Sequence, residues 1–282
     1  MSSTTATHTR TLTALRRRVG YPHLLATTLV LVVATILLGV ATRAAGAGLA
    51  CDANWPLCDG GVLNLFPAGF PSFFEWIHRV VAMVAGVFIV GAAVQAWRGS
   101  AGKLVTWAVT IGLVLTPIQV SLGRETVLSY DLTVLNLHFW TAIAIFVCFA
   151  AATVLVWEHR IEATRVPLAL GVATLLVPVQ IVFSPLVIES YTPVMHTLQD
   201  SVTLALLFAS LVAGIVGAIR FDGYRSRALT VTPLLGLVVI YLGREAVMGF
   251  DPLVDFIYLV ATGAVCLVLG VLTWDTYRTV SE

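Results

Sequence analysis

The sequence predicts an all-α membrane protein with eight transmembrane helices, arranged as two four-helix bundles related by a parallel internal repeat. Of the 282 residues, 59% are hydrophobic and only 11% are charged, whereas soluble domains carry about 25% charged residues. Eight apolar segments follow one another along the chain. A ten-residue segment also recurs 120 positions later, which divides these segments into two sets of four.

Each apolar segment is long enough to cross the hydrocarbon core as a helix. They cover residues 22–42, 74–97, 103–122, 134–157, 166–187, 194–219, 228–247 and 254–274. Prolines at positions 117, 178 and 185 fall inside them, where neighbouring helices can satisfy the freed backbone groups. The first segment shares features with a cleaved signal peptide. Its apolar run is longer than that class usually has, so we expect it to be retained.

The distribution of Lys and Arg predicts the orientation in the membrane. With the N-terminus inside, the outer side holds four of the 16 basic residues, namely Arg43, Arg79, Arg124 and Arg244, and the cytoplasmic segments hold the rest. A net charge of +1 gives no reason to expect a nucleic-acid partner. We therefore expect a multi-pass protein of the cell membrane, surrounded by lipid, with both termini in the cytoplasm.

The repeat sets the predicted domain boundaries. LGRETVLSYD at 122–131 recurs as LGREAVMGFD at 242–251, with six of ten positions identical. Because each half holds four spans, the halves share one topology, related by an axis along the membrane normal. The predicted parts are a cytoplasmic tail (1–21), a first half (22–157) with an outer loop (43–73), a cytoplasmic linker (158–165), a second half (166–274) and a tail (275–282).

Three histidines are expected at one depth, near the outer ends of the second, fourth and sixth spans: His78, His138 and His196. The repeat pairs His138 with Tyr258, and it pairs His78 with His196 after a two-residue deletion. Two imidazoles facing each other across a four-helix bundle suit the two axial positions of haem iron. Hydrogen bonding between helices is the alternative, and zinc would need three or four grouped ligands.

Charged and thiol groups cluster near the first of these histidines. Glu75 lies one helical turn before His78 and next to Arg79 in space, either as an interfacial ion pair or as a functional carboxylate. Cys51 and Cys58 lie in the outer loop, where thiols tend to oxidise, so they are expected to form a disulfide. That disulfide is either a structural staple or a redox site.

These motifs together resemble the haem A synthase family in its eight-helix bacterial and archaeal form. The motifs are Cys51-x6-Cys58 around Trp55-Pro56-Leu57, then Glu75-x-x-His78-Arg79, then VSLGRETVL, then His138. The resemblance covers nearly the whole chain and is most specific in the first half. It implies an oxidoreductase that converts the C8 methyl of haem O into the formyl group of haem A, which is then used by terminal oxidases.

The resemblance also implies roles for individual residues. His78 and His138 would be the axial ligands of haem O in the first half, with Glu75 as the catalytic carboxylate. Cys51 and Cys58 would assist haem handling or redox transfer, and the second half would hold haem B as a cofactor, with iron also bound at His196. The implied partners are a haem O synthase, the assembly of a terminal oxidase and an unknown electron acceptor, and a homo-oligomer is left open.

The candidate contacts for haem propionates are three outer arginines: Arg79, Arg124 and Arg244. For the last two, the alternative is a snorkelling side chain at the membrane interface.

The sequence departs from the family pattern in the second half. Tyr258 stands where the pattern expects the last histidine, and the loop SPLVIESYTPV has no cysteine pair. Tyrosine can ligate haem iron, but a helix-borne tyrosine is more often an interfacial anchor. A second haem would thus be ligated by His196 alone or by His196 with Tyr258, or it would be absent.

Two other functions remain alternatives. A b-type haem electron-transfer protein, resembling quinol or ferric-reductase cytochromes, would not modify haem. It is disfavoured because all candidate ligands lie on the outer side, whereas electron transfer across the membrane needs haems toward both faces. A transporter built on a parallel repeat is disfavoured because the spans are apolar at mid-depth apart from Gln95, Gln119, Gln180 and scattered hydroxyls.

Overall fold

The computed structural model describes residues 20–51, 54–55, 58, 66–67, 69–99, 101–129, 131–188, 192–249 and 251–282. Nearly all of the predicted N-terminal tail (1–21) lies outside these residues, and so do Pro56 and Leu57 of the outer-loop motif. Within the described part of the chain there is no strand, and eight helical segments are long and apolar enough to cross a membrane. The predicted all-α polytopic class is therefore confirmed.

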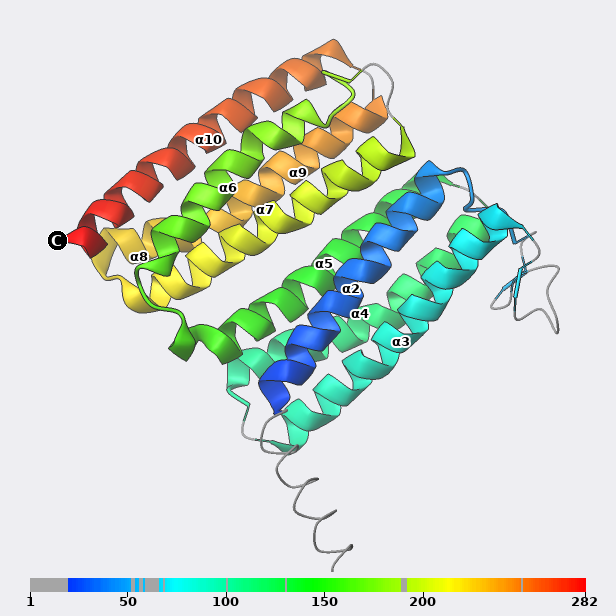
Figure 1. Cartoon of the computed structure of the whole chain (residues 1–282), viewed down its shortest axis with the longest axis horizontal. Helices are drawn as coiled ribbons and strands as arrows, with labels where there is room; N and C mark the ends of the chain where they lie inside the picture. Colours follow the sequence, from blue (N-terminus) through cyan, green and yellow to red (C-terminus); the bar gives the residue numbers. More distant parts are fainter. Residues whose placement is uncertain are drawn as a thin grey trace, which may run out of the picture.

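The first half contains α2 (Tyr21–Ala44), α3 (Phe70–Arg98), α4 (Lys103–Leu128) and α5 (Leu132–Trp157), followed by a short 3-10 turn at Glu158–Arg160. The second half contains α6 (Arg165–Val182), α7 (Pro193–Arg220), α8 (Gly223–Thr230), α9 (Thr232–Gly249) and α10 (Pro252–Ser281). The two sets of helices form two bundles that lie side by side (Figure 1).

Packing within each bundle places alternate helices on a diagonal. In the first bundle, α2 and α4 each pack against both α3 and α5, so α3 and α5 face each other across the interior. In the second bundle, α6 and α9 each pack against both α7 and α10. Helix α7 also packs against α2 and α5 and joins the bundles. It is accordingly the most buried of the spans in the described chain.

Local sequence signals move several helix ends from their predicted places. Helix α3 begins at Phe70 rather than 74 because Pro71 favours a first helical turn. Helix α6 ends at Val182, and Pro185 lies beyond it rather than inside a span, because proline cannot continue a helix and disfavours helical backbone in the preceding residue. The predicted span 228–247 is divided between α8 and α9 at Val231.

The C-terminal helix extends beyond the predicted span 254–274. Helix α10 continues to Ser281, so most of residues 275–282 are helical. Asp275 holds this extension to α8, because its carboxylate accepts hydrogen bonds from Arg225 Nε at 2.7 Å and from the Tyr224 hydroxyl at 3.0 Å. This ion pair joins α8 to α10 and stabilises the last turns of α10, which the hydropathy pattern did not assign to the helix.

The two copies of the repeated segment end α4 and α9 and lead into α5 and α10. Their shared aspartates cap the following helices: Asp131 Oδ1 accepts from the Thr133 N–H at 2.7 Å, and Asp251 Oδ1 accepts from the Leu253 N–H at 2.9 Å. Such caps satisfy backbone donors that have no partner inside the helix. Helix capping therefore explains why both copies of the segment end in aspartate. The repeat of the two whole halves remains a prediction.

Candidate functional site

His78 on α3 and His138 on α5 lie on the diagonal helices of the first bundle, and their role as a facing ligand pair stays a prediction. Each imidazole packs against a glycine of an adjacent helix. A Cβ added to Gly39 of α2 would come within 2.9 Å of His78 Cε1, and one added to Gly123 of α4 would come within 3.0 Å of His138 Cε1. Each ring therefore occupies the space that a side chain at position 39 or 123 would need, so glycine is needed there for the ring to keep this position.

The two imidazoles have buried nitrogens without protein partners. Nδ1 of His78 and Nδ1 of His138 make no hydrogen bond to any described residue. Nε2 of His138 lies 3.3 Å from Nε2 of Gln119 on α4. A buried polar atom left without a partner costs about 1–3 kcal/mol. This pair of imidazoles on facing helices fits the axial ligands of a haem iron, because imidazole is a common axial ligand and each ring keeps one buried nitrogen without a partner among the described residues.

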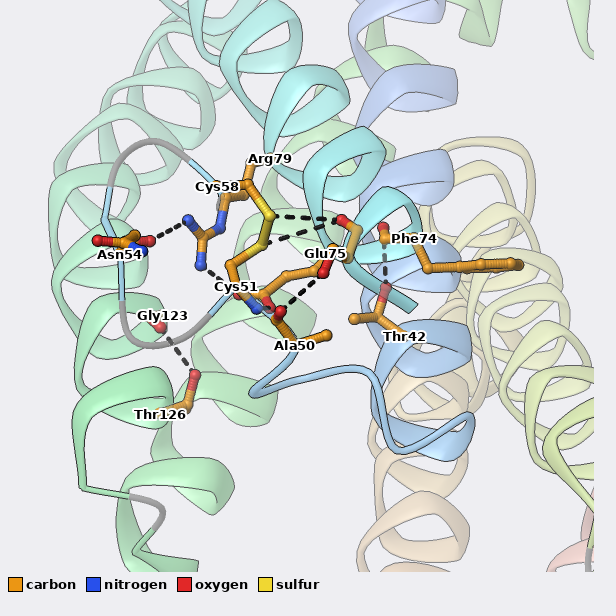
Figure 2. Close-up of polar contacts among 11 residues, drawn as sticks. Thr42, Ala50, Cys51, Asn54, Cys58, Phe74, Glu75, Arg79, Gly123 and Thr126 are labelled. Carbon is orange, nitrogen blue, oxygen red and sulfur yellow. Dashed lines mark hydrogen bonds and ion pairs between the residues drawn. A yellow bond between two sulfur atoms is a disulfide. The ribbon is translucent and has the colours of Figure 1, made fainter. Parts of the chain in front are cut away.

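Glu75 is buried one turn before His78, with 3% of its surface exposed. Its Oε2 accepts a hydrogen bond from the Cys51 N–H at 3.2 Å, and its carboxylate forms an ion pair with Arg79. Arg79 in turn donates to the Asn54 carbonyl oxygen at 2.7 Å. Figure 2 shows this chain of contacts running from the start of α3 to the outer loop. The predicted ion pair between Glu75 and Arg79 is therefore present, and a catalytic role for Glu75 stays a prediction.

Cys51 and Cys58 form a disulfide, with Cα atoms 4.7 Å apart. Both sulfur atoms lie near the Ser72 carbonyl oxygen, at 3.8 and 3.6 Å, and the Ser72 hydroxyl donates to the Ala50 carbonyl oxygen at 2.7 Å. The disulfide closes the outer loop, and hydrogen bonds from the Ser72 hydroxyl to Ala50 and from the Cys51 N–H to Glu75 hold the described part of that loop to the start of α3 (Figure 2). It lies at the same end of the helix as Glu75, so loop and carboxylate are held together.

The second bundle places its predicted residues differently. His196 of α7 lies 3.7 Å from Oδ2 of Asp200, one turn further along the same helix. Both line a small pocket with Gln180 of α6 and Arg244 of α9, which is partly open to the outside and has a cavity volume of about 40 Å³ for the centres of water-sized molecules. Tyr258 of α10 is fully buried against Gly243, which lines this pocket, and its hydroxyl has no partner among the described residues.

These residues do not fit a haem held by two axial ligands. The described residues that line the pocket include His196 but no second imidazole, thiolate or phenolate. Tyr258 packs into the apolar core of the second bundle rather than lining this pocket. His196 is paired with a carboxylate inside a charged pocket, whereas His78 and His138 have unpartnered nitrogens. The first bundle fits haem, whereas the second repeats the packing of a side chain on a glycine, Tyr258 on Gly243, without a second imidazole.

The candidate propionate contacts also differ from one another. Arg124 is half exposed and bonds to its neighbour Glu125 at 2.7 Å. Arg244 crosses to the first bundle, where its Nε donates to Asn136 Oδ1 at 2.6 Å and its guanidinium stacks 4.0 Å from the Phe139 ring centroid. One amino group of Arg244 is buried and has no hydrogen-bond partner among the described residues. The interfacial reading suits Arg124, whereas Arg244 joins the two bundles.

Sequence reasoning missed several residues of these sites. Gly39, Gln119 and Asp200 contact the predicted histidines, and none was predicted. The His-x-x-x-Asp spacing in α7 was visible, because residues four apart share a helix face. Nothing in the sequence signals the contacts of Gly39 and Gln119, because each contact depends on how two helices pack.

The model of the cytochrome oxidase assembly protein family matches residues 22–274, which is most of the chain. The chain belongs to this family. The resemblance to haem A synthases is confirmed by relatives of that name: the protein of Bacillus licheniformis is 29% identical over 43% of this chain and 40% of its own length, and that of Alkalihalophilus pseudofirmus is 30% identical over 48% and 46%. The family is one of membrane assembly proteins, in agreement with the eight spans.

A second group of relatives carries another name. The protohaem IX farnesyltransferase of Halobacterium salinarum is 34% identical over 48% of this chain, a match that covers 29% of the relative. The chain thus spans less than half the length of each of the relatives named here. No solved structure matches this chain.

Proposed function

We propose that this protein is a haem A synthase that oxidises the C8 methyl of haem O to a formyl group. The observation that carries the proposal is the pair of imidazoles, His78 and His138, on diagonal helices with buried nitrogens that have no protein partner. Relatives named haem A synthase support the same reaction. Two axial histidines alone would equally suit a haem that only transfers electrons. The side chains beside the histidines therefore distinguish haem oxidation from electron transfer.

In this proposal, Glu75 supplies the chemistry and the outer loop positions it. Oxidation of a methyl group builds positive charge on its carbon, and a fixed carboxylate near the porphyrin edge stabilises that charge. Glu75 is one helical turn from His78 and is held by Cys51 and Arg79. Because its environment is set before the substrate arrives, little reorganisation is needed during the reaction. Arg79 orients the carboxylate through its own bond to the loop.

The proposal extends to cellular context. The charge distribution favours cytoplasmic termini, which places the His78 and His138 site toward the outer face of the cell membrane. A haem O synthase would supply the substrate, and the assembly of a terminal oxidase would use the product. Similarity to a protohaem farnesyltransferase supports the first link, and membership of a cytochrome oxidase assembly family supports the second.

Extraction and mass identification of haems tests the proposal. The protein is expressed in a host that makes haem O but no haem A, and wild type is compared with Glu75→Gln and His138→Ala. We expect wild type to accumulate haem A, Glu75→Gln to retain haem O unconverted, and His138→Ala to lose most bound haem. His159→Ala is the matched control, because His159 is exposed outside the site. Haem A formation by Glu75→Gln at the wild-type level would refute the role of the carboxylate.

A second outcome tests the function itself. If wild type binds haem O stably and yields no haem A with any electron acceptor, the protein is not a haem A synthase. Rapid reduction of its bound haem by a quinol, without haem modification, would then favour the electron-transfer alternative.

A further inference from the structure

The pocket around His196 holds groups that the proposed oxidation of haem O does not use. It brings together the His196 and Asp200 pair on α7, the guanidinium of Arg244 on α9 and the carboxamide of Gln180 on α6. Phe139 of α5 forms one wall, apolar residues of α9 form another, and the polar residues Gln199 and Thr203 of α7 complete the lining. Charged side chains are costly inside a membrane protein unless they serve a pathway or a ligand.

The chemistry of this pocket excludes two classes of ligand. A bis-ligated porphyrin lacks its second axial group, as the site geometry shows. A metal ion lacks ligands, because no described group of three His, Cys, Asp or Glu residues is placed to hold one.

The pocket instead suits a neutral carbonyl compound that takes up protons when it is reduced. Arg244 has a buried amino group that finds no acceptor in the described part of the chain, and a carbonyl oxygen is an acceptor. Asp200 and His196 form a pair of titratable groups that can exchange a proton with a bound ligand. Aromatic and aliphatic walls contact the rest of the ligand. We propose that this pocket binds the head group of an isoprenoid quinone, a lipid-soluble molecule with these properties.

The position of the pocket allows it to serve the first bundle. His138 and Phe139 are consecutive residues of α5, and Phe139 lines the pocket. Arg244 is held against the same helix by Asn136. The haem site and the quinone pocket therefore share α5, with one on each side of the seam between bundles. Electrons that leave a haem ligated by His138 need to cross only this helix.

The inference rests on the proposed function for the source of its electrons. In the overall balance, one methyl group and one water give one formyl group with the release of four electrons and four protons. Two C–H bonds and two O–H bonds break, and one C=O bond forms. Each quinone takes two electrons and two protons to become a quinol, so two quinones are reduced in succession. Asp200 and His196 pass the protons, and Arg244 stabilises the charge on the reduced oxygen.

Binding of menadione, a soluble quinone head group, tests the site without relying on haem oxidation. Its affinity for the full-length protein in lipid nanodiscs is measured by calorimetry. We expect one menadione per chain for wild type, and an affinity weakened roughly tenfold or more in Asp200→Asn and Arg244→Gln, since each removes a charge-assisted contact. Asp255→Asn and Arg227→Gln are the matched controls, because neither residue lines the pocket. Circular dichroism and haem content report whether each variant is folded.

The possible outcomes separate this inference from the proposed function. Equal menadione affinity in wild type, Asp200→Asn and Arg244→Gln would overturn the site. A second haem per chain that His196→Ala removes would also overturn it, by assigning the pocket to haem. Haem A formation with ferricyanide as acceptor, together with no menadione binding, would refute only the quinone site. Menadione binding with no haem A under any acceptor would refute the proposed function while the site stands.

Discussion

Replacing Gly39 by alanine should displace the His78 imidazole from its place in the first bundle. The new methyl group would lie 2.9 Å from Cε1 and 3.3 Å from Nε2 of His78, whereas carbon atoms in contact prefer about 3.5–4.0 Å. Either the ring moves by several tenths of an ångström or α2 and α3 separate. Metal–ligand distances are fixed to within about 0.2 Å, so a shift of this size matters at an iron ligand.

Two opposing terms set the size of the effect. Alanine is better than glycine within a helix by about 1 kcal/mol, and overpacking costs about 1–3 kcal/mol. The global stability of Gly39→Ala should thus change little, while the strain falls on the haem-bound state. A penalty of about 1.4 kcal/mol in that state alone lowers haem affinity tenfold. We therefore expect a loss of haem that is not matched by a loss of thermal stability.

The assay is haem titration of the purified protein, followed by its absorption spectrum, with thermal unfolding measured in parallel. The matched control is Gly91→Ala on α3, where an added methyl would meet nothing within 4 Å. We expect the control to bind haem as wild type does, and Gly39→Ala to lose affinity and its six-coordinate spectrum. Wild-type affinity and spectrum in Gly39→Ala would refute the assignment of His78 as an axial ligand.

Three further predictions follow from individual contacts. Replacing Cys51 and Cys58 by serine should lower the free energy of unfolding by roughly 2–3 kcal/mol, because the loop is no longer closed, and should reduce the yield of haem A. Unfolding curves measured with and without reductant check this. A wild-type protein whose stability does not change with reductant would contradict it. Tyr258→Phe should retain all bound haem and be slightly more stable, since the buried hydroxyl has no described partner; loss of one haem would instead make Tyr258 a ligand. Hydrogen bonds from the backbone N–H groups of Val134 and Thr133 lower the pKa of Asp131. The Asp131 cap therefore contributes to stability above the ordinary pKa of about 3.8, and this contribution is lost as pH falls through the lower pKa of the folded state. The melting temperatures of wild type and Asp131→Ala should converge in acid, and a difference that stays constant with pH would contradict the cap.

The sequence alone determined the membrane class, the number of spans and most of their positions. Apolar length is a local property, because each span must satisfy its own backbone in lipid. The sequence also predicted that His78 and His138 belong together, because their depth follows from where each span starts. The disulfide between Cys51 and Cys58 was predictable from spacing and expected compartment, and the structure confirms it.

Only the tertiary structure decided what surrounds these residues. Glu75 is held by a backbone N–H from a loop 24 positions away, and His78 rests on a glycine of another helix. The two halves diverge for the same reason: Arg124 is half exposed beside its neighbour in sequence, while Arg244 reaches 108 positions back to Asn136. Hydropathy reports the depth of a side chain in the membrane, but it does not report which helix that side chain faces. Those contacts arise from helix packing, and they separate a proposed haem site in one bundle from a charged pocket in the other.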